Sequence, residues 1–214
     1  MKLLIHGMQS SGATAFTLFL AQRPDCLALV DISNRFAAPN VSPALDMVAK
    51  TVITTAFPLA VHQDKFQPDK TILFLRDPRD NYVSLETKNY RDGSGMMEEK
   101  FAVLDQVFRN RSAVDAVIHY EDFVARDPNV LAAVEKLGWP VQDEYYTYRR
   151  RHDAIFADLW THLPHLFTEM QLVFGNVQGR EVTDSKQRKS WDAEVEARLE
   201  TLCPQLLAHY RARQ

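Results

Sequence analysis

Arg76 and Ser84 stand eight positions apart after an apolar run, and these residue types at this spacing suit a phosphate site. The run Thr71–Leu75 is β-branched and aromatic, which is typical of a buried strand, and Pro78 stands where a following helix would start. Arginine offers a phosphate a planar fork of donors, and a serine hydroxyl near a helix start adds one hydrogen bond. The alternative is that the charged residues among 76–80 form only a solvated surface network.

A second anion-binding pattern opens the chain. Residues from Gly7 to Thr14 follow the apolar run Lys2–Ile5 and have the frame G-x-x-x-x-G-x-T of a phosphate-binding loop. Glycines let the backbone wrap around an anion, and the amides and dipole of a helix start favour negative charge. Ala13 stands where a kinase-type loop carries the lysine that holds the outer phosphates. The alternative is a strand-to-helix turn that binds nothing.

The run LLIHG followed by SSG also resembles the His-Gly segment that opens many α/β-hydrolases. Such an enzyme needs a nucleophile elbow, and no G-x-S-x-G occurs in the chain. The hydrolase interpretation is therefore disfavoured, and His6 is most simply a strand-end side chain without a chemical role.

Length and composition limit the class of protein. The 214 residues fit a single domain, 1–214, with a sizeable core. A formal net charge of −3 is unlike that of non-specific nucleic-acid binders, so we expect no nucleic-acid partner and a local anion site. Cys26 and Cys203 lie far apart in apolar surroundings, which suits reduced thiols. The start of the chain has too few apolar residues for a signal peptide or membrane span, so we expect a soluble cytoplasmic protein.

Short β-rich runs alternate with longer amphipathic stretches, which predicts an α/β fold of three layers around a mostly parallel sheet. The strand candidates, each followed by a plausible helix, are Lys2–Ile5, Cys26–Val30, Thr51–Thr55, Thr71–Leu75 and Ala116–His119. Proline after a capping or turn residue marks helix starts at Ser42-Pro43, Asp77-Pro78 and Asp127-Pro128. After Gly138 the pattern is mostly helical, with a last helix from about Asp192 to Tyr210 that is stepped at Pro204, and this part is expected to close one side of a site.

The two anion-binding patterns, followed by a basic stretch near the C-terminus, resemble the sulfotransferases that use 3′-phosphoadenosine 5′-phosphosulfate (PAPS). The resemblance covers most of the chain. The family signature R-[ND]-P-[RK]-D-x-x-x-S is matched in full from Arg76 to Ser84, and by that resemblance these two residues would bind the 3′-phosphate. The family's first loop, roughly P-[RK]-S-G-T-T, holds the 5′-phosphosulfate. The corresponding residues here are Gln9, Ser10, Ser11, Gly12, Ala13 and Thr14.

Two further stretches are similar to the family in the same order. Residues 117–123 resemble its strand ending in Y-E-D-[LM], by which Tyr120 would lie near the adenine. Residues 185–191, SKQRKSW, loosely resemble its basic closing segment, which implies that Arg188 and Lys189 add positive charge around the 3′-phosphate. The alternative for this last stretch is a solvated basic turn.

Two side chains that the family uses in catalysis are missing. Ser10 stands where the first loop usually carries a lysine or arginine, and Val52 replaces the histidine base of a K-T-H segment. Lys50, which precedes the predicted third strand and matches a family lysine near the sulfate, is the candidate for the absent cation. For the base we choose Asp31, because it emerges at the C-terminal end of the strand Cys26–Val30, where parallel sheets bind ligands. The alternative is that Asp31 only caps a turn.

The resemblance therefore predicts a sulfotransferase that moves a sulfuryl group from PAPS to a hydroxyl or amine of an unidentified small-molecule or glycan acceptor. The product would be 3′-phosphoadenosine 5′-phosphate (PAP), and no metal is expected. One alternative is a P-loop kinase, in which Leu27–Asp31 would supply a strand ending in a magnesium-linked aspartate; Ala13 argues against it. The other is a catalytically impaired family member that binds nucleotide or a partner. The loop Tyr90–Met97, with its glycines, is expected to border the acceptor pocket.

Overall fold

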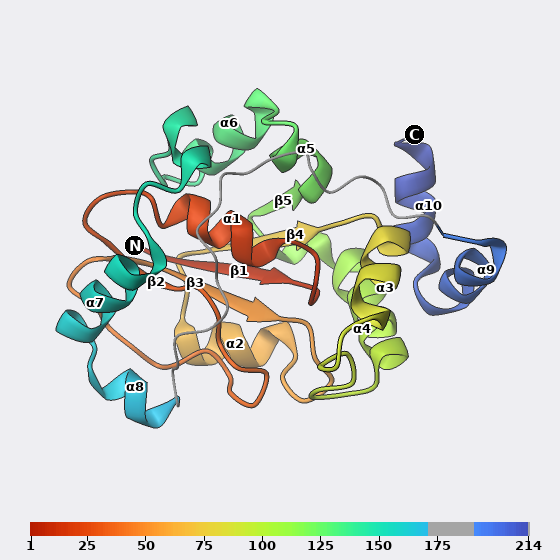
Figure 1. The fold of residues 1–214 in the computed structure, drawn as a ribbon, viewed down its shortest axis with the longest axis horizontal. Coiled ribbons are helices and arrows are strands. Elements are labelled where there is room, and N and C mark those ends of the chain that lie inside the picture. The colour runs from red at the N-terminus through yellow and green to blue at the C-terminus, as the bar shows by residue number, and fades with distance from the viewer. Residues whose placement is uncertain (171–190, 214) are drawn as a thin grey trace.

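The computed structural model describes residues 1–170 and 191–213, and within them five parallel strands form one sheet (Figure 1). The strands are β1 (Lys2–Gly7), β2 (Cys26–Leu29), β3 (Asp46–Val52), β4 (Lys70–Leu75) and β5 (Ala116–His119). Their spatial order is β2-β3-β1-β4-β5. The predicted parallel α/β class is therefore confirmed.

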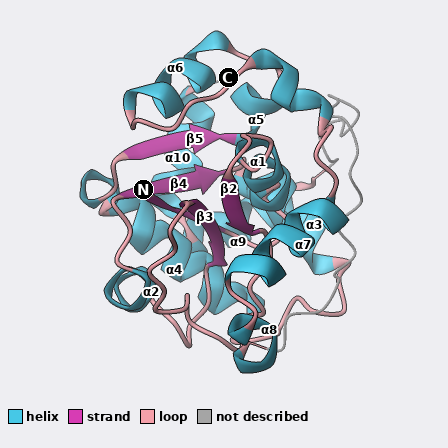
Figure 2. Cartoon of the chain, turned by 90° about the vertical axis from the view of Figure 1, so that its left-hand side faces the viewer, coloured by secondary structure: helices cyan, strands magenta, loops and turns pink. Residues whose placement is uncertain are grey.

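Helices lie on both sides of the strands (Figure 2). They are α1 (Ala13–Leu20), α2 (Leu59–Phe66), α3 (Pro78–Glu86), α4 (Met97–Arg109), α5 (Tyr120–Val124), α6 (Pro128–Lys136), α7 (His152–His162), α8 (His165–Glu169), α9 (Ala193–Leu202) and α10 (Pro204–Ala212), with short 3₁₀ turns at Arg111–Ala113 and Asp143–Thr147. The predicted starts at Pro78 and Pro128 are confirmed, as is the step at Pro204. Of the helices described, none is long and apolar enough to cross a membrane.

Successive side chains of each strand point to opposite faces of the sheet, and a different set of helices covers each face. Leu3 and Phe74 pack on one face with residues of α1, α5 and α6. On the opposite face, Leu73 packs with α3, α4, α9 and α10, whereas Leu4 packs with Phe66 of α2. This arrangement confirms the three layers.

The segment between β2 and β3 is where the sequence-based prediction was wrong. No helix starts at Ser42-Pro43, and β3 begins at Asp46 rather than at Thr51. The residues after Pro43 pair with β1 instead, with Leu3 opposite Val48 and Ile5 opposite Lys50. Long-range strand pairing thus overrides the local signal for a helix start. Lys50 consequently lies inside the strand that it was expected to precede.

Strand β2 forms one edge of the sheet, and α7 packs against it. Ile155 of α7 belongs to the core of one face and Leu159 to a core of the other, so the helix straddles the edge. An exposed strand edge can pair with other chains, and α7 covers this one.

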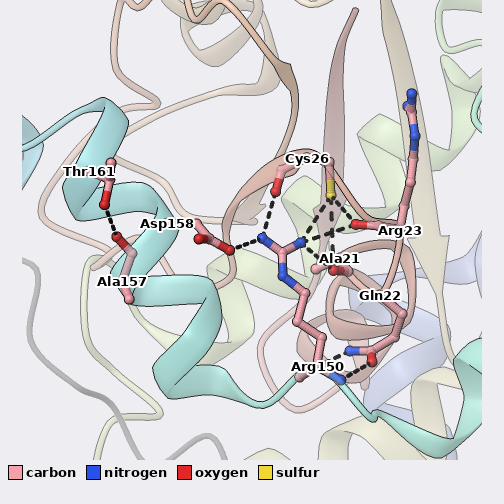
Figure 3. A network of polar contacts seen from close by, with 8 residues as sticks. All are labelled: Ala21, Gln22, Arg23, Cys26, Arg150, Ala157, Asp158 and Thr161. Atoms are coloured by element: carbon pink, nitrogen blue, oxygen red, sulfur yellow. Dashed lines mark hydrogen bonds and ion pairs between the residues drawn. The ribbon is translucent and has the colours of Figure 1, made fainter.

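Arg150 lies just before α7 and connects the helical segment that begins there to the end of α1 and the start of β2 (Figure 3). Its guanidinium donates to the main-chain carbonyl oxygens of Ala21, Arg23 and Cys26. The Gln22 side chain forms two hydrogen bonds with the backbone of Arg150. Its Oε1 accepts from the Arg150 N–H at 2.6 Å, and its Nε2 donates to the Arg150 carbonyl at 3.0 Å. These bonds fix where the C-terminal part begins relative to α1 and β2.

Neither cysteine is available as a nucleophile. Cys26 and Cys203 are both free and buried. Burial raises the pKa of the thiol in each case, which favours the unreactive neutral form. The prediction that the two cysteines are reduced thiols, and not a disulfide, is confirmed.

Candidate functional site

Those predicted site residues that the structure describes gather at the carboxyl edge of the sheet. Strand β1 lies between β3 and β4; the chain leaves β1 toward β2 on one side of the sheet and leaves its neighbour β4 toward β5 on the other. Open parallel sheets bind ligands at such a switch point. The first loop (residues 8–12), Asp31, Arg76 and Tyr120 follow the ends of β1, β2, β4 and β5 respectively. The topology therefore brings these separated segments to one edge.

The first loop leads directly into α1. Ser10 and Gly12 both have left-handed backbone angles, with φ of 60° and 94°, and the Ser11 N–H donates to the Met8 carbonyl at 3.2 Å. Gly12 is the N-cap residue and has no side chain with which to cap the helix. The first-turn amides of α1 therefore face the loop, as in an anion-binding helix start, although the Ala13 N–H also reaches the Ser11 hydroxyl at 3.4 Å.

Tyr120 packs against this loop. A Cβ on Gly12 would lie 2.5 Å from Cδ2 of the tyrosine, so the ring directly covers the glycine. The guanidinium carbon of Arg76 lies 4.7 Å from the centroid of the same ring. Tyr120 therefore holds the loop and the arginine together. The proximity of Tyr120 to an adenine stays a prediction.

Arg76 is a buried cation that uses only part of its donor set. The residue is 2% exposed, and Nη1 donates to the Ser10 carbonyl at 3.0 Å. Nε and Nη2 are buried and have no hydrogen-bond partner among the described residues. Because unpaired buried donors on a cation cost free energy, an anion is the ligand that this position fits.

The surface-network alternative for residues 76–80 is wrong. Arg76, Asp77, Arg79 and Asp80 are each at most 6% exposed. Asp77 caps α3 by accepting from the Arg79 N–H, and it also accepts from Nε and Nη2 of Arg79 at 2.9 and 2.7 Å. The hydrogen bonds that Arg79 donates to the Asp77 carboxylate raise the pKa of Arg79. Arg79 is thus committed to its neighbour, whereas Arg76 keeps donors for a ligand.

Ser84 lies on the side of α3 that faces the first loop. Asn81, three residues earlier, donates from Nδ2 to the Gln9 carbonyl at 2.7 Å. Residues three apart are neighbours on one helix face, so the half-buried Ser84 lies on the same side. Whether its hydroxyl binds a phosphate stays a prediction.

Both predicted catalytic residues are in direct contact. Nζ of Lys50 lies 2.6 Å from Oδ1 of Asp31 and 3.0 Å from Oγ1 of Thr14. The Lys50 side chain is 6% exposed and that of Asp31 is 56% exposed, so the pair runs from the sheet to the surface. Within the described residues, Asp31 accepts from Lys50 and no turn amide donates to it, so the capping alternative is not favoured.

Sequence reasoning missed Lys100 of α4. The residue is 0% exposed and donates to Gln9 Oε1 at 2.8 Å, and burial lowers the pKa of its ammonium. The available signal was its position on the buried face of α4, beside Met97, Phe101 and Leu104. A lysine within such an apolar stripe indicates a buried partner.

Three further predictions concern the basic segment near the C-terminus, a metal site and His6. Arg188 and Lys189 lie outside the described residues. Among the residues that are described, no group of three or more His, Cys, Asp or Glu side chains could hold a metal ion. His6 is buried in β1 with Nδ1 2.9 Å from the Thr51 hydroxyl, and burial lowers its pKa to about 3, so it is a neutral internal residue.

No protein-family model and no curated protein matches the sequence. The chain is similar at low identity to several solved structures, of a retinol dehydratase and of two sulfotransferases. Retinol dehydratase with retinol and PAP is 12% identical, with coverage of 96% of this chain and 81% of that one and a TM-score of 0.48. A sulfotransferase from Alicyclobacillus acidocaldarius is 18% identical, with coverage of 98% of both chains and a TM-score of 0.48. Mouse sulfotransferase SULT7A1 with PAP is 13% identical, with coverage of 94% and 82% and a TM-score of 0.45. These likenesses are too distant to assign a role to any residue of this chain.

Gly12→Ala is expected to destabilise the protein, because the new Cβ would meet the Tyr120 ring and φ is 94°. Gly138→Ala is the matched control, since Gly138 has a similar φ of 89° but the new Cβ would come no closer than 3.9 Å to a neighbouring atom, Met1 Sδ. Backbone strain alone should cost the control about 1 kcal/mol, and the steric clash should add about 1–3 kcal/mol at Gly12, measured by urea denaturation. Equal losses in the two variants would contradict the packing of Tyr120 on the loop.

Proposed function

We propose that this protein is a sulfotransferase that uses PAPS as its donor and a hydroxyl or amine of a small molecule or glycan as its acceptor. The observation that carries the proposal is the buried guanidinium of Arg76, whose Nε and Nη2 lack partners among the described residues. This unsatisfied cation lies beside a glycine loop that opens into a helix start. A donor with phosphates at both its 3′ and 5′ positions fits two such anion-binding elements.

The residues fit this donor in the following way. The first-turn amides of α1 and the hydroxyl of Thr14 would hold the 5′ end. Because Thr14 accepts its hydrogen bond from Lys50, its own O–H stays available to donate outward. Arg76, held by the Ser10 carbonyl and the Tyr120 ring, would present its remaining donors to the 3′-phosphate, with Ser84 adding a hydroxyl.

The Asp31–Lys50 pair fits the needs of group transfer. When bound, PAPS would supply an activated sulfuryl group whose leaving group is a phosphate. Lys50 has three donors and uses two on Thr14 and Asp31, so one remains to stabilise negative charge on a substrate oxygen. Asp31 is held through Oδ1, which leaves Oδ2 on an exposed side chain to take the proton of an acceptor hydroxyl or amine.

The contact between Lys50 and Thr14 also disfavours the kinase alternative. In a kinase-type loop the hydroxyl at this position helps to hold Mg²⁺, together with an aspartate at a strand end. Here the ammonium of Lys50 lies against both Thr14 and Asp31, at 3.0 and 2.6 Å. A fixed positive charge at that place repels a divalent cation.

Arg76→Ala is expected to remove the preference for a 3′-phosphorylated nucleotide. Charge-assisted hydrogen bonds from a buried arginine predict that PAP affinity falls about tenfold to a hundredfold, while affinity for 5′-AMP changes by less than about threefold. Isothermal titration calorimetry with both nucleotides measures this difference. The control is Arg111→Ala, because Arg111 is exposed and lies before the amino end of β5, whereas the site lies at the carboxyl ends of the strands. A wild-type preference for ATP with magnesium over PAP would refute the proposal.

Asp31→Asn is expected to abolish transfer but to preserve donor binding. Loss of a general base lowers turnover by about 10² to 10⁴-fold, measured as PAP release from PAPS with a mixture of phenols, alcohols and amines. PAP affinity should stay within about threefold of wild type, since the carboxylate does not contact the phosphate groups in this assignment. Asp64→Asn, an exposed position on α2, is the control and should retain full turnover. Turnover that survives in Asp31→Asn would show that another group is the base.

A further inference from the structure

Lys100 is a fully buried ammonium with no part in the chemistry proposed above. Its Nζ donates to Gln9 Oε1 at 2.8 Å, to the Gly93 carbonyl at 3.0 Å and to the Arg91 carbonyl. An ammonium has three donors, so all of its hydrogen-bonding capacity is used. A buried cation depends strongly on such partners, because each unpaired donor costs free energy.

The partners of Lys100 belong to two different segments. Gln9 is in the first loop, where its backbone carbonyl also accepts from Asn81 of α3. Arg91 and Gly93 are in the 90–95 loop, which we define as residues 90–95 of the connection between α3 and α4. Lys100 therefore links the loop assigned to the donor with a second loop far from it in sequence.

The 90–95 loop packs on the half of the sheet edge that carries Asp31 and Lys50. The Ser94 hydroxyl donates to the carbonyl of Asn34, which follows β2, at 2.8 Å. The Ser94 carbonyl accepts from the N–H of Thr55, which follows β3, at 3.3 Å. Gly95 has a φ of 121°, and a Cβ there would lie 2.3 Å from the Thr55 hydroxyl oxygen, so the fit is close. Tyr90 in this loop and Met96 directly after it are 51% and 58% exposed.

We infer that Lys100 is a positioning residue that couples the nucleotide loop to the 90–95 loop through Gln9. A ligand that fixes the first loop would fix Gln9, and the bond to Lys100 would then hold the 90–95 loop in place beside the Asp31–Lys50 pair. Coupling of this kind is reciprocal, so order in the 90–95 loop would also favour nucleotide binding. The inference rests on the proposed function only in taking PAP as the ligand of the first loop.

Trypsin reports on this link directly. Arg91 is exposed, and its carbonyl, which belongs to the peptide bond that trypsin would cleave, accepts a hydrogen bond from Lys100. Cleavage after Arg91 therefore requires the loop to open and release that carbonyl. Cleavage after Arg111, an exposed residue in a 3₁₀ turn, serves as the internal control.

Gln9 allows the link to be removed and restored. Gln9→Met removes the acceptor for Lys100, and without nucleotide the rate of cleavage after Arg91 should rise about fivefold or more, the lower end of usual coupling effects. Gln9→Glu keeps an oxygen acceptor at that place and should stay within about twofold of wild type. Lys100→Met should also raise cleavage after Arg91, and if it fails to fold, the two Gln9 variants decide. Cleavage after Arg111 should not change in any of them.

Saturating PAP separates coupling from a merely structural role. PAP should slow cleavage after Arg91 about fivefold or more in wild type and in Gln9→Glu, but not in Gln9→Met, even when calorimetry shows that the variant is saturated. The inference is overturned if Gln9→Met is cleaved at the wild-type rate or if PAP still protects it as it protects wild type. If wild type binds no PAP, the proposed function fails, whereas the ligand-free comparison of the Gln9 variants still decides the role of Lys100.

Discussion

The need of buried cations for oxygen partners organises this site. Among the described residues, three such cations contact the single stretch Gln9–Thr14, each from a different part of the fold. Arg76, after β4, donates to the Ser10 carbonyl; Lys50, within β3, donates to Thr14; and Lys100, within α4, donates to Gln9. A cation excluded from water must find partners of this kind, so each one fixes the position of part of the loop.

The three cations differ in how much capacity they leave for a ligand. Within the described structure, Lys100 has used all three donors, Lys50 has used two, and Arg76 leaves Nε and Nη2 buried without partners. In the proposed account, the three cations therefore have different tasks: Lys100 positions the loop, Lys50 bridges it to Asp31, and Arg76 binds the ligand. Positive charge beside the loop comes from these other segments, and in the proposed function it would take the place of a lysine after Gly12, where the chain has Ala13.

Local patterns in the sequence predicted the parts of the site that lie on one continuous segment. The glycine loop before α1 and the run from Arg76 to Ser84, which leads from β4 into α3, have the predicted secondary structure. Patterns that depend on distant partners were less reliable. The Ser42-Pro43 signal for a helix failed because the residues after it pair with β1, and the same pairing places Lys50 inside β3. Lys100 was overlooked because its partner Gln9 is 91 positions away.

The central claim is that Arg76 holds the 3′-phosphate of a nucleotide through donors that have no described protein partner. Nuclear magnetic resonance of arginine side-chain Nε–H groups tests it most directly, with the Arg76 signal assigned by its loss in Arg76→Lys. Hydrogen bonding to a phosphate predicts that this signal shifts when PAP is added and stays in place when 5′-AMP is added. An Arg76 signal that does not move while PAP binds, or that moves equally with both nucleotides, would contradict the account.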